Sequence, residues 1–353
     1  MRICYLNHDT RDNTGAGRFY NALSRAVRTA MPGVEIEVLT SENLLYPNKL
    51  KLLLALPAIR KVISQCDIIH ALDGWPYGVI AALTALGLKK KLVITAVGTG
   101  AVQPLHDPLR RKLMAWAYKK ADRVVAVSTN TRKEIQKVIP DLKIELINHG
   151  VDVSKLQTVS AGYQAEAQKL KPYILSVGTL KKRKGFIYSI EAFAKIANRF
   201  ADLKYVIVGG GPEKPMLDKK IQELGIEGRV VYMTGLHQDF VNALYQNAEL
   251  FILLSQNFGK DIEGFGLVFL EAAAAGLPVI GTRETGAVDA VADGKNGFLA
   301  PQGDAEEAAK AMAKLLADKN LKESFAKESV KFAQSMNWEK AAQSYKTIYA
   351  SLV

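Results

Sequence analysis

Short, continuous apolar runs alternate with helix-like segments along the chain, in two successive blocks. In the first block the apolar runs, which are predicted strands, are 3–6, 36–39, 68–70, 92–96, 124–127 and 144–147. In the second block they are 173–177, 205–208, 230–233, 250–254 and 278–281. Runs without polar alternation are typical of parallel strands buried on both faces. The pattern therefore predicts an α/β protein with two doubly wound, Rossmann-like domains.

Segments with helical spacing lie between and after these runs, at 18–30, 109–118, 186–200, 213–224, 240–247, 267–275, 305–317 and 338–352. The stretch 151–171 has no strong apolar period, and we expect it to hold the linker. The predicted domains are 1–160 and 161–335. Open α/β sheets bind ligands beyond the carboxyl ends of their strands, so two such sheets facing a central cleft would place the chemistry in the loops after the strands.

The charge of the chain is concentrated in its first part. The net charge is +12 over 353 residues, and residues 1–150 hold 22 Lys and Arg against 12 Asp and Glu. An anionic lipid surface would attract such a domain, and so would nucleic acid on charge alone. A solvated basic surface explains the excess equally well. The two cysteines, Cys4 and Cys66, lie in apolar runs, and no run approaches the ~18 residues of a membrane span. We expect a cytoplasmic protein with reduced cysteines.

Two carboxylates, Glu263 and Glu271, stand eight positions apart around the turn Gly264-Phe265-Gly266. The glycines allow close approach of a ligand, and the amides of the helix that starts near Leu267 would point at an anion. Glu271 lies among apolar helix residues, and a buried carboxylate needs a polar partner such as a sugar hydroxyl. The alternative is an ordinary loop whose glutamate pairs with a nearby lysine.

A basic loop follows the strand 173–177, with four consecutive cations from Lys181 to Lys184 before Gly185. Cations at the carboxyl end of a strand are well placed to neutralise a diphosphate, and a solvated basic turn is the alternative. A weaker phosphate-loop pattern, Asn13-Thr14-Gly15-Ala16-Gly17, separates the first strand and helix. No D-x-D pattern occurs in the sequence, so no metal-bridged diphosphate site is indicated.

These motifs resemble those of the retaining GT-B glycosyltransferases of family 4, which include sucrose synthase relatives and bacterial mannosyl- and glucosyltransferases. Glu263 to Glu271 is similar to their E-x7-E signature, and 121–128, 148–152, 275–280 and 293–299 resemble family segments. The resemblance implies that Glu263 contacts the hexose and Glu271 the donor ribose. It also implies diphosphate contacts from Lys184 and Arg183, and a cytoplasmic hexosyltransferase that needs no metal or cofactor.

Further donor contacts are expected from Gly264, Phe265, Gly266, Leu267, Thr179 and Gly235, the last near the base, and the resemblance implies that Gly15 and Gly17 meet the donor diphosphate or the acceptor. Two positions depart from the family pattern. Thr179 replaces a common arginine, which Arg183 would compensate. Val97 stands where the family often has a histidine near the reacting sugar. Three alternatives follow: the histidine is dispensable, Thr99, His106 or Asp107 substitutes for it, or the chain is not a normal catalyst.

The predicted reaction moves a hexose from a GDP- or UDP-sugar to an acceptor hydroxyl with retention of the anomeric configuration. The first domain would bind the acceptor, a glycan or lipid-linked molecule of the cell envelope, with peripheral contact to an anionic membrane and not nucleic acid. The second domain would bind the donor, and the final helix, 336–353, would pack back on the first domain. Two alternatives stay open, namely a non-catalytic nucleotide-sugar-binding scaffold and a GT-B sugar-nucleotide epimerase.

Overall fold

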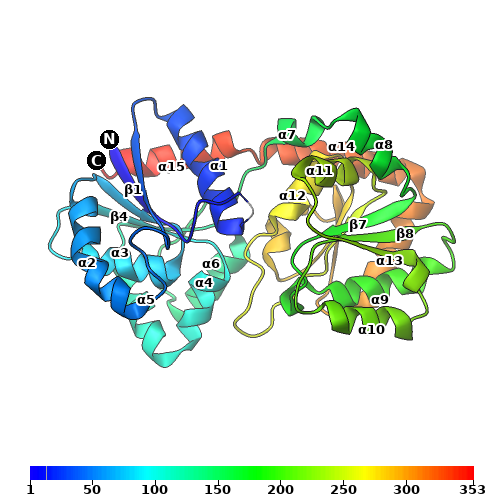
Figure 1. The fold of residues 1–353 in the computed structure, drawn as a ribbon, viewed down its shortest axis with the longest axis horizontal. Coiled ribbons are helices and arrows are strands. Elements are labelled where there is room, and N and C mark those ends of the chain that lie inside the picture. The colour runs from blue at the N-terminus through cyan, green and yellow to red at the C-terminus, as the bar shows by residue number, and fades with distance from the viewer. Residues whose placement is uncertain (13) are drawn as a thin grey trace. The chain divides into compact units, whose positions relative to one another are not determined.

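The computed structural model describes residues 1–12 and 14–353. The chain forms two units, each a six-stranded parallel sheet with helices on both faces (Figure 1). The first unit comprises Met1–Gly150 and Trp338–Val353, and the second comprises Val151–Asn337. The predicted α/β class with two doubly wound domains is confirmed. The first segment of the first unit ends at Gly150, ten residues before the predicted boundary, and the unit also includes the final segment, which was expected to pack back on the first domain.

The sheet of the first unit has the strand order β2-β1-β3-β4-β5-β6. Its strands are β1 (Arg2–Leu6), β2 (Glu35–Leu39), β3 (Ile68–Ala71), β4 (Lys91–Ala96), β5 (Arg123–Ala126) and β6 (Glu145–Leu146). All six predicted strands of this half occur. The chain reverses its direction across the sheet between β1 and β3, so the loops after these two strands flank a topological switch point, where open α/β sheets bind ligands.

The helices of the first unit are α1 (Gly15–Ala30), α2 (Lys49–Ser64), α3 (Val79–Thr84), α4 (Thr99–Val102), α5 (Pro108–Lys120), α6 (Thr129–Val138) and α15 (Trp338–Ala350). Two shorter helical turns are η1 (Gly74–Gly78) and η2 (Gln103–His106). Right-handed crossovers in opposite directions place α1 on one face of the sheet and α2, α3 and α5 on the other. On that second face α2 packs against α3, and α3 packs against α5.

The last helix, α15, packs beside α1 and completes the core of the first unit. A chain of buried polar side chains joins it to the sheet. The Tyr349 hydroxyl lies 2.7 Å from Nδ1 of His70 and 3.0 Å from the Tyr5 hydroxyl, and Nε2 of His70 lies 2.8 Å from the Thr95 hydroxyl. Burial lowers the pKa of His70 to about 3, so this histidine is a neutral core residue.

The sheet of the second unit has the order β12-β11-β10-β7-β8-β9. Its strands are β7 (Tyr173–Val177), β8 (Lys204–Val208), β9 (Val230–Met233), β10 (Phe251–Ile252), β11 (Val279–Thr282) and β12 (Gly297–Ala300). The sequence predicted the first five of these, and β12 was missed. The chain leaves β7 toward one edge and returns at β10 toward the other, so the switch point lies between β7 and β10.

The second unit holds α7 (Val153–Gln157), α8 (Ala161–Gln168), α9 (Phe186–Ala197), α10 (Lys214–Glu223), α11 (Gln238–Asn247), α12 (Leu267–Ala274), α13 (Ala305–Ala317) and α14 (Lys319–Ser335). Shorter turns are η3 (Lys182–Lys184), η4 (Glu227–Arg229) and η5 (Gly286–Asp289). Both cysteines are buried, and neither forms a disulfide. Within the described ranges, no helix has the length and apolar character needed to cross a bilayer.

Candidate functional site

The loops after β7 and β10 meet at the switch point of the second unit. Gly185 ends the β7 loop in the left-handed conformation, with φ of 61°. A Cβ at this glycine would stand 1.7 Å from the Leu254 carbonyl oxygen, so no other residue fits. The Gln256 amide also donates a 2.7 Å hydrogen bond to the Arg183 carbonyl. The backbone therefore fixes the predicted basic loop against the loop that leads to Glu263.

Three side chains converge on one oxygen of Glu263, whose residue is only 5% exposed. Nζ of Lys184 lies 2.7 Å and Nη1 of Arg183 2.8 Å from Oε2, and the Ser255 hydroxyl donates to the same oxygen at 3.2 Å. Burial alone would raise the pKa of Glu263, but Lys184 and Arg183 outweigh it and hold the pKa below its usual range. Glu263 is therefore an ionised carboxylate in a buried position.

The structure thus brings together Glu263, predicted to contact the hexose, and Lys184 and Arg183, predicted to contact the diphosphate. It also contains the lysine-paired glutamate that the sequence analysis kept as an alternative. Arg183 makes a second ion pair through Nε, 3.3 Å from Asp261. Both cations remain partly exposed, with 22% of the Arg183 side chain and 13% of the Lys184 side chain accessible. They can reach a bound anion while they keep contact with Glu263.

Helix α12 begins at the same place. Gly266 precedes it with φ of 83°, and its first turn carries no acidic residue. Its first amides therefore present partial positive charge to an anion. Glu271, one turn further on, is half-buried, and its Oε2 accepts a 3.1 Å hydrogen bond from the buried Tyr245 hydroxyl. Within the protein, the polar partner that Glu271 needs among the apolar residues of α12 is the Tyr245 hydroxyl.

The other residues of the second unit that were predicted for the donor site lie along the carboxyl edge of the same sheet. Gly264 and Phe265 are buried between Glu263 and α12, and Leu267 is the first residue of α12. Thr179 is exposed directly after Gly178 in the β7 loop. Gly235 follows β9, and the order β10-β7-β8-β9 places it along the same carboxyl edge of the sheet, beyond β8.

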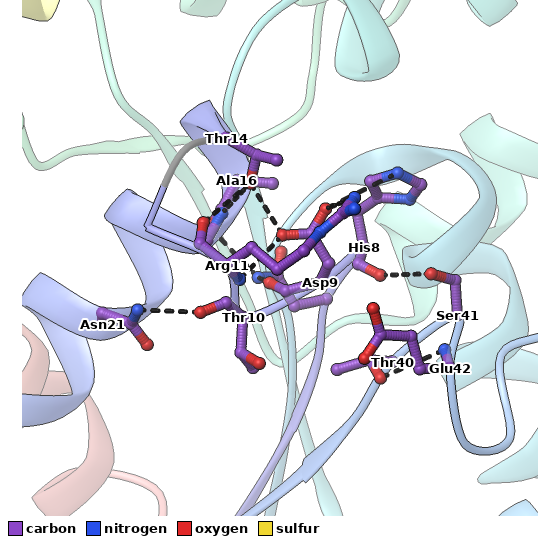
Figure 2. A network of polar contacts seen from close by, with 12 residues as sticks. His8, Asp9, Thr10, Arg11, Thr14, Ala16, Asn21, Thr40, Ser41 and Glu42 are labelled. Carbon is purple, nitrogen blue, oxygen red and sulfur yellow. Dashed lines mark hydrogen bonds and ion pairs between the residues drawn. The ribbon is translucent and has the colours of Figure 1, made fainter. Parts of the chain in front are cut away.

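In the first unit, the loop between β1 and α1 is organised around Asp9, which is fully buried (Figure 2). Its carboxylate accepts from the Thr14 hydroxyl at 2.7 Å, the Arg11 amide at 3.0 Å and the Arg11 guanidinium at 2.9 Å. Burial would raise the pKa of Asp9, and these donors hold it below its usual value. Arg11 itself stays more than half exposed. Asp9 thus orients an accessible guanidinium at the β1 switch point.

The two glycines of this loop have different surroundings. A Cβ at Gly17 would stand 2.1 Å from the Arg11 carbonyl oxygen, so the chain itself requires Gly17. Gly15 is exposed and has open space around its Cα. Thr14 caps the start of α1, because its hydroxyl oxygen accepts a 2.9 Å hydrogen bond from the Gly17 amide. Asn13, the first residue of the predicted pattern, lies outside the described residues.

Beyond β4, Val97 is followed by a bend and by α4, which contains Thr99. His106 is exposed at the end of η2, whereas Asp107 accepts the Arg110 amide and begins α5. The structure places a different carboxyl group, that of Asp73, within hydrogen-bond distance of the Val97 amide. Asp73, after β3, accepts hydrogen bonds from the amides of Gly74 and Val97, and burial raises its pKa to about 7.

Sequence reasoning missed four polar residues at these two switch points, namely Ser255, Tyr245, Asp73 and Asp9. Three of them carried a signal, because Ser255, Asp73 and Asp9 each follow a predicted strand at its carboxyl end. Tyr245 lies within α11 and reaches Glu271 across the fold, so local sequence gave no indication of its contact. Within the described residues, no group of three or more His, Cys, Asp or Glu could hold a metal ion.

The chain is similar to known glycosyltransferases. Residues 164–332 match the glycosyl transferases group 1 family, and residues 16–155 match glycosyltransferase family 4. An N-acetyl-alpha-D-glucosaminyl L-malate synthase of Bacillus anthracis is 30% identical over 81% of this chain and 75% of its own length. A GDP-mannose-dependent alpha-(1-6)-phosphatidylinositol monomannoside mannosyltransferase of Mycobacterium tuberculosis is 29% identical over 74% of this chain and 70% of its own.

Solved structures share the whole fold. A sucrose-phosphate synthase from Thermosynechococcus elongatus superposes with a TM-score of 0.83 at 22% identity, over 100% of this chain and 99% of the other. The Anabaena protein HepE, solved in complex with UDP, gives a TM-score of 0.81 at 20% identity, over 99% and 100% of the two chains. At these identities the likeness concerns the two-domain GT-B fold alone.

Proposed function

This chain belongs to the family 4 glycosyltransferases of GT-B fold and is a nucleotide-sugar glycosyltransferase, and on that premise we propose that it transfers a hexose with retention of the anomeric configuration. The observation that carries the proposal is the group of Glu263, Lys184 and Arg183 at the switch point of the second unit. It combines an ionised carboxylate with two cations in a position where open α/β sheets bind ligands.

In this proposal the second unit binds the donor. Lys184 and Arg183 neutralise the diphosphate, together with the amides that begin α12 after Gly266. Oε2 of Glu263 stays paired with Lys184 and Arg183, and Oε1 orients the sugar hydroxyls. Glu271, positioned by Tyr245, accepts from the donor ribose. The exposed Thr179 and Gly235 border the nucleotide at the same edge of the sheet.

The chemical step is a same-face displacement. The bond between the anomeric carbon and the phosphate oxygen breaks, a bond to the acceptor oxygen forms, and the leaving phosphate takes the acceptor proton. Lys184 and Arg183 stabilise the charge that develops on that phosphate. Because side-chain cations and helix amides supply this charge stabilisation, the proposed reaction proceeds without a metal ion. Unchanged turnover in excess EDTA would agree with it, and restoration of lost turnover by Mg²⁺ or Mn²⁺ would contradict it.

We infer that the donor is a GDP- or UDP-sugar, because one relative is named as GDP-mannose-dependent and HepE was solved with UDP. We assign the acceptor to the first unit and to the glycans or glycolipids of the cell envelope, because that relative's name specifies a phosphatidylinositol mannoside. Arg11 and Asp73 lie at the first unit's switch point, with Thr99 and His106 in the segment after β4. The free, buried cysteines are in keeping with a cytoplasmic enzyme.

The test incubates purified protein with UDP-, GDP- and ADP-sugars, each with and without a panel of glycan and glycolipid acceptors. Product analysis by NMR gives the configuration of the new bond. We expect transfer from one donor with the donor's configuration kept. Inverted product would contradict retention. Binding without turnover would indicate a scaffold, and a changed sugar nucleotide with donor alone would indicate an epimerase.

A further inference from the structure

An arginine at the carboxyl edge of the first sheet is held in a defined position and yet remains accessible. Arg11 lies in the loop between β1 and α1, and its amide and its Nη2 both donate to the buried carboxylate of Asp9, at 3.0 and 2.9 Å. Its backbone packs so closely on α1 that a Cβ at Gly17 would collide with it. The side chain is nevertheless 58% exposed. The loop thus presents a guanidinium whose orientation is set before any ligand binds.

Most of the hydrogen-bonding capacity of this guanidinium is unused. A guanidinium has five N–H donors and no acceptor. Among the residues that the structure describes, the side chain of Arg11 has one hydrogen-bond acceptor, Oδ2 of Asp9. Asp9 has other donors as well, because its Oδ1 accepts from the Thr14 hydroxyl at 2.7 Å and from the Arg11 amide. The pairing with Asp9 therefore accounts for one of the five donors, and the others are available to a ligand.

A second side chain with a ring nitrogen lies beside the guanidinium. The His8 side chain is 56% exposed, and its Nε2 lies 3.9 Å from the same Asp9 oxygen that Arg11 contacts. Its Nδ1 lies 2.9 Å from the hydroxyl of Tyr77, in η1 after β3. Figure 2 shows the imidazole and the guanidinium next to each other at Asp9. The loops after β1 and β3, the two strands at the topological switch point, thus position one group of donors.

We propose that Arg11 and His8 bind a phosphate group of the acceptor, which carries the reacting hydroxyl on the same molecule. The inference rests on the proposed transfer reaction and deepens its assignment of the acceptor to the first unit. A guanidinium pairs with two oxygens of a phosphate through parallel N–H bonds, a geometry that a neutral hydroxyl does not offer. A phosphate has a further oxygen for the imidazole, whereas the guanidinium alone would occupy both oxygens of a carboxylate.

The donor diphosphate is the other source of phosphate oxygens. In the proposed reaction it already has Lys184, Arg183 and the first amides of α12, all in the second unit. The two units are alike in this respect, because each has a buried carboxylate at its switch point, Glu263 or Asp9, that pairs with a partly exposed arginine. Two such arginines suit two charged substrates, and the donor accounts for the arginine of the second unit.

The test is modification of the full chain with phenylglyoxal, which reacts with arginine side chains, followed by mass spectrometry of peptides to measure each arginine separately. The reaction is run without ligand and with inorganic phosphate, glycerol phosphate, glycerol, UDP or GDP, at constant ionic strength. We expect phosphate and glycerol phosphate to slow the modification of Arg11 by roughly tenfold at saturation. Glycerol should leave the rate unchanged.

Arg2 is the matched control within the molecule. It also pairs with one carboxylate, that of Glu35 at 3.4 Å, and its side chain is 42% exposed. It begins β1 and therefore lies at the opposite edge of the same sheet. Phosphate should not change its rate of modification. The variant His8→Gln replaces an exposed side chain, and in it phosphate should protect Arg11 less well than in the natural sequence.

Equal modification of Arg11 with and without phosphate would overturn the proposal, and so would equal slowing at Arg2. Full protection of Arg11 in the His8 variant would remove His8 from the site. Protection by UDP or GDP at concentrations about tenfold below those of phosphate would assign Arg11 to the donor diphosphate instead. Since the measurement requires no sugar transfer, its failure and the failure of the proposed reaction are separate results.

Discussion

At the scale of single residues, burial and neighbouring charges have opposite effects on the pKa of Glu263 in the second unit. Glu263 would be costly to ionise in its buried position without Lys184 and Arg183, and these cations are held in place by Glu263. Sequence spacing predicted these three residues because they lie in two local motifs. Ser255 and Tyr245 could not be predicted as their partners, because the folded chain alone brings them to Glu263 and Glu271.

Replacing Lys184 with Ala should lower turnover by about 10²–10³-fold, because the developing charge on the leaving phosphate loses its nearest cation. The measurement is steady-state transfer with the natural donor. The matched control is Lys181→Ala, which removes an exposed cation from the same loop. Near-normal turnover in the Lys184 variant, or an equal loss in the Lys181 variant, would refute the diphosphate role.

Asp73 should make the first unit less stable as the pH rises. Burial raises its pKa in the folded protein to about 7, above the value near 4 of an unfolded aspartate. The folded state therefore binds the proton more tightly, and this stabilisation, complete below about pH 4, is lost as the pH rises toward 7 and above. Urea unfolding at a series of pH values gives the free energy of unfolding. Between about pH 4 and 7 this free energy should decline less in the Asp73→Asn variant than in the natural sequence. Parallel declines in both proteins would show that Asp73 does not titrate in this way.

At the scale of elements, buried parallel strands were predictable because each is a short unbroken apolar run. The short strand β12 was missed because the run 297–300 begins with a glycine directly after the polar segment 293–296. Helix α2 was missed for a different reason. It has apolar residues on both sides and contains Pro57, so it lacks the one-sided period by which a surface helix is recognised.

Replacing Tyr349 with Phe should destabilise the first unit by about 1–3 kcal/mol, because the change leaves the buried His70 and Tyr5 without a hydrogen-bond partner from α15. Chemical denaturation measures the change in the free energy of unfolding. Thr347→Ala is the control, since the hydroxyl of this exposed residue of the same helix donates to the Gln343 carbonyl one turn back, outside the buried network. Equal effects of the two substitutions would argue against a structural role for the buried network.

At the scale of the whole molecule, the sequence predicted two doubly wound domains but placed the first boundary too late. Residues 151–160 lack a strong apolar period and resembled a linker. In the structure they belong to the second unit through long-range contacts. The Val151 amide donates to the Met336 carbonyl, and the Asn242 side chain donates to the Lys155 carbonyl. The local composition of residues 151–160 does not indicate these long-range hydrogen-bond partners.

Removal of residues 338–353 should unfold the first unit and leave the second unit folded. Tyr345, Tyr349 and their neighbours on α15 are part of the first unit's core, whereas the second unit is one uninterrupted segment with its own sheet. Limited proteolysis of the truncated chain should therefore yield a resistant fragment close to 151–337. Equal resistance of both halves would show that α15 is dispensable for the first core.

The return of α15 to the first unit also sets an order for synthesis. A ribosome makes the chain from its N-terminus, and domains generally fold as they emerge. The second unit is complete once Asn337 has left the ribosome. The first unit, although its strands are made first, must wait for the final helix before its core is closed. The first unit is thus synthesised first but completes its folding last. Until α15 packs against it, part of its apolar core is exposed.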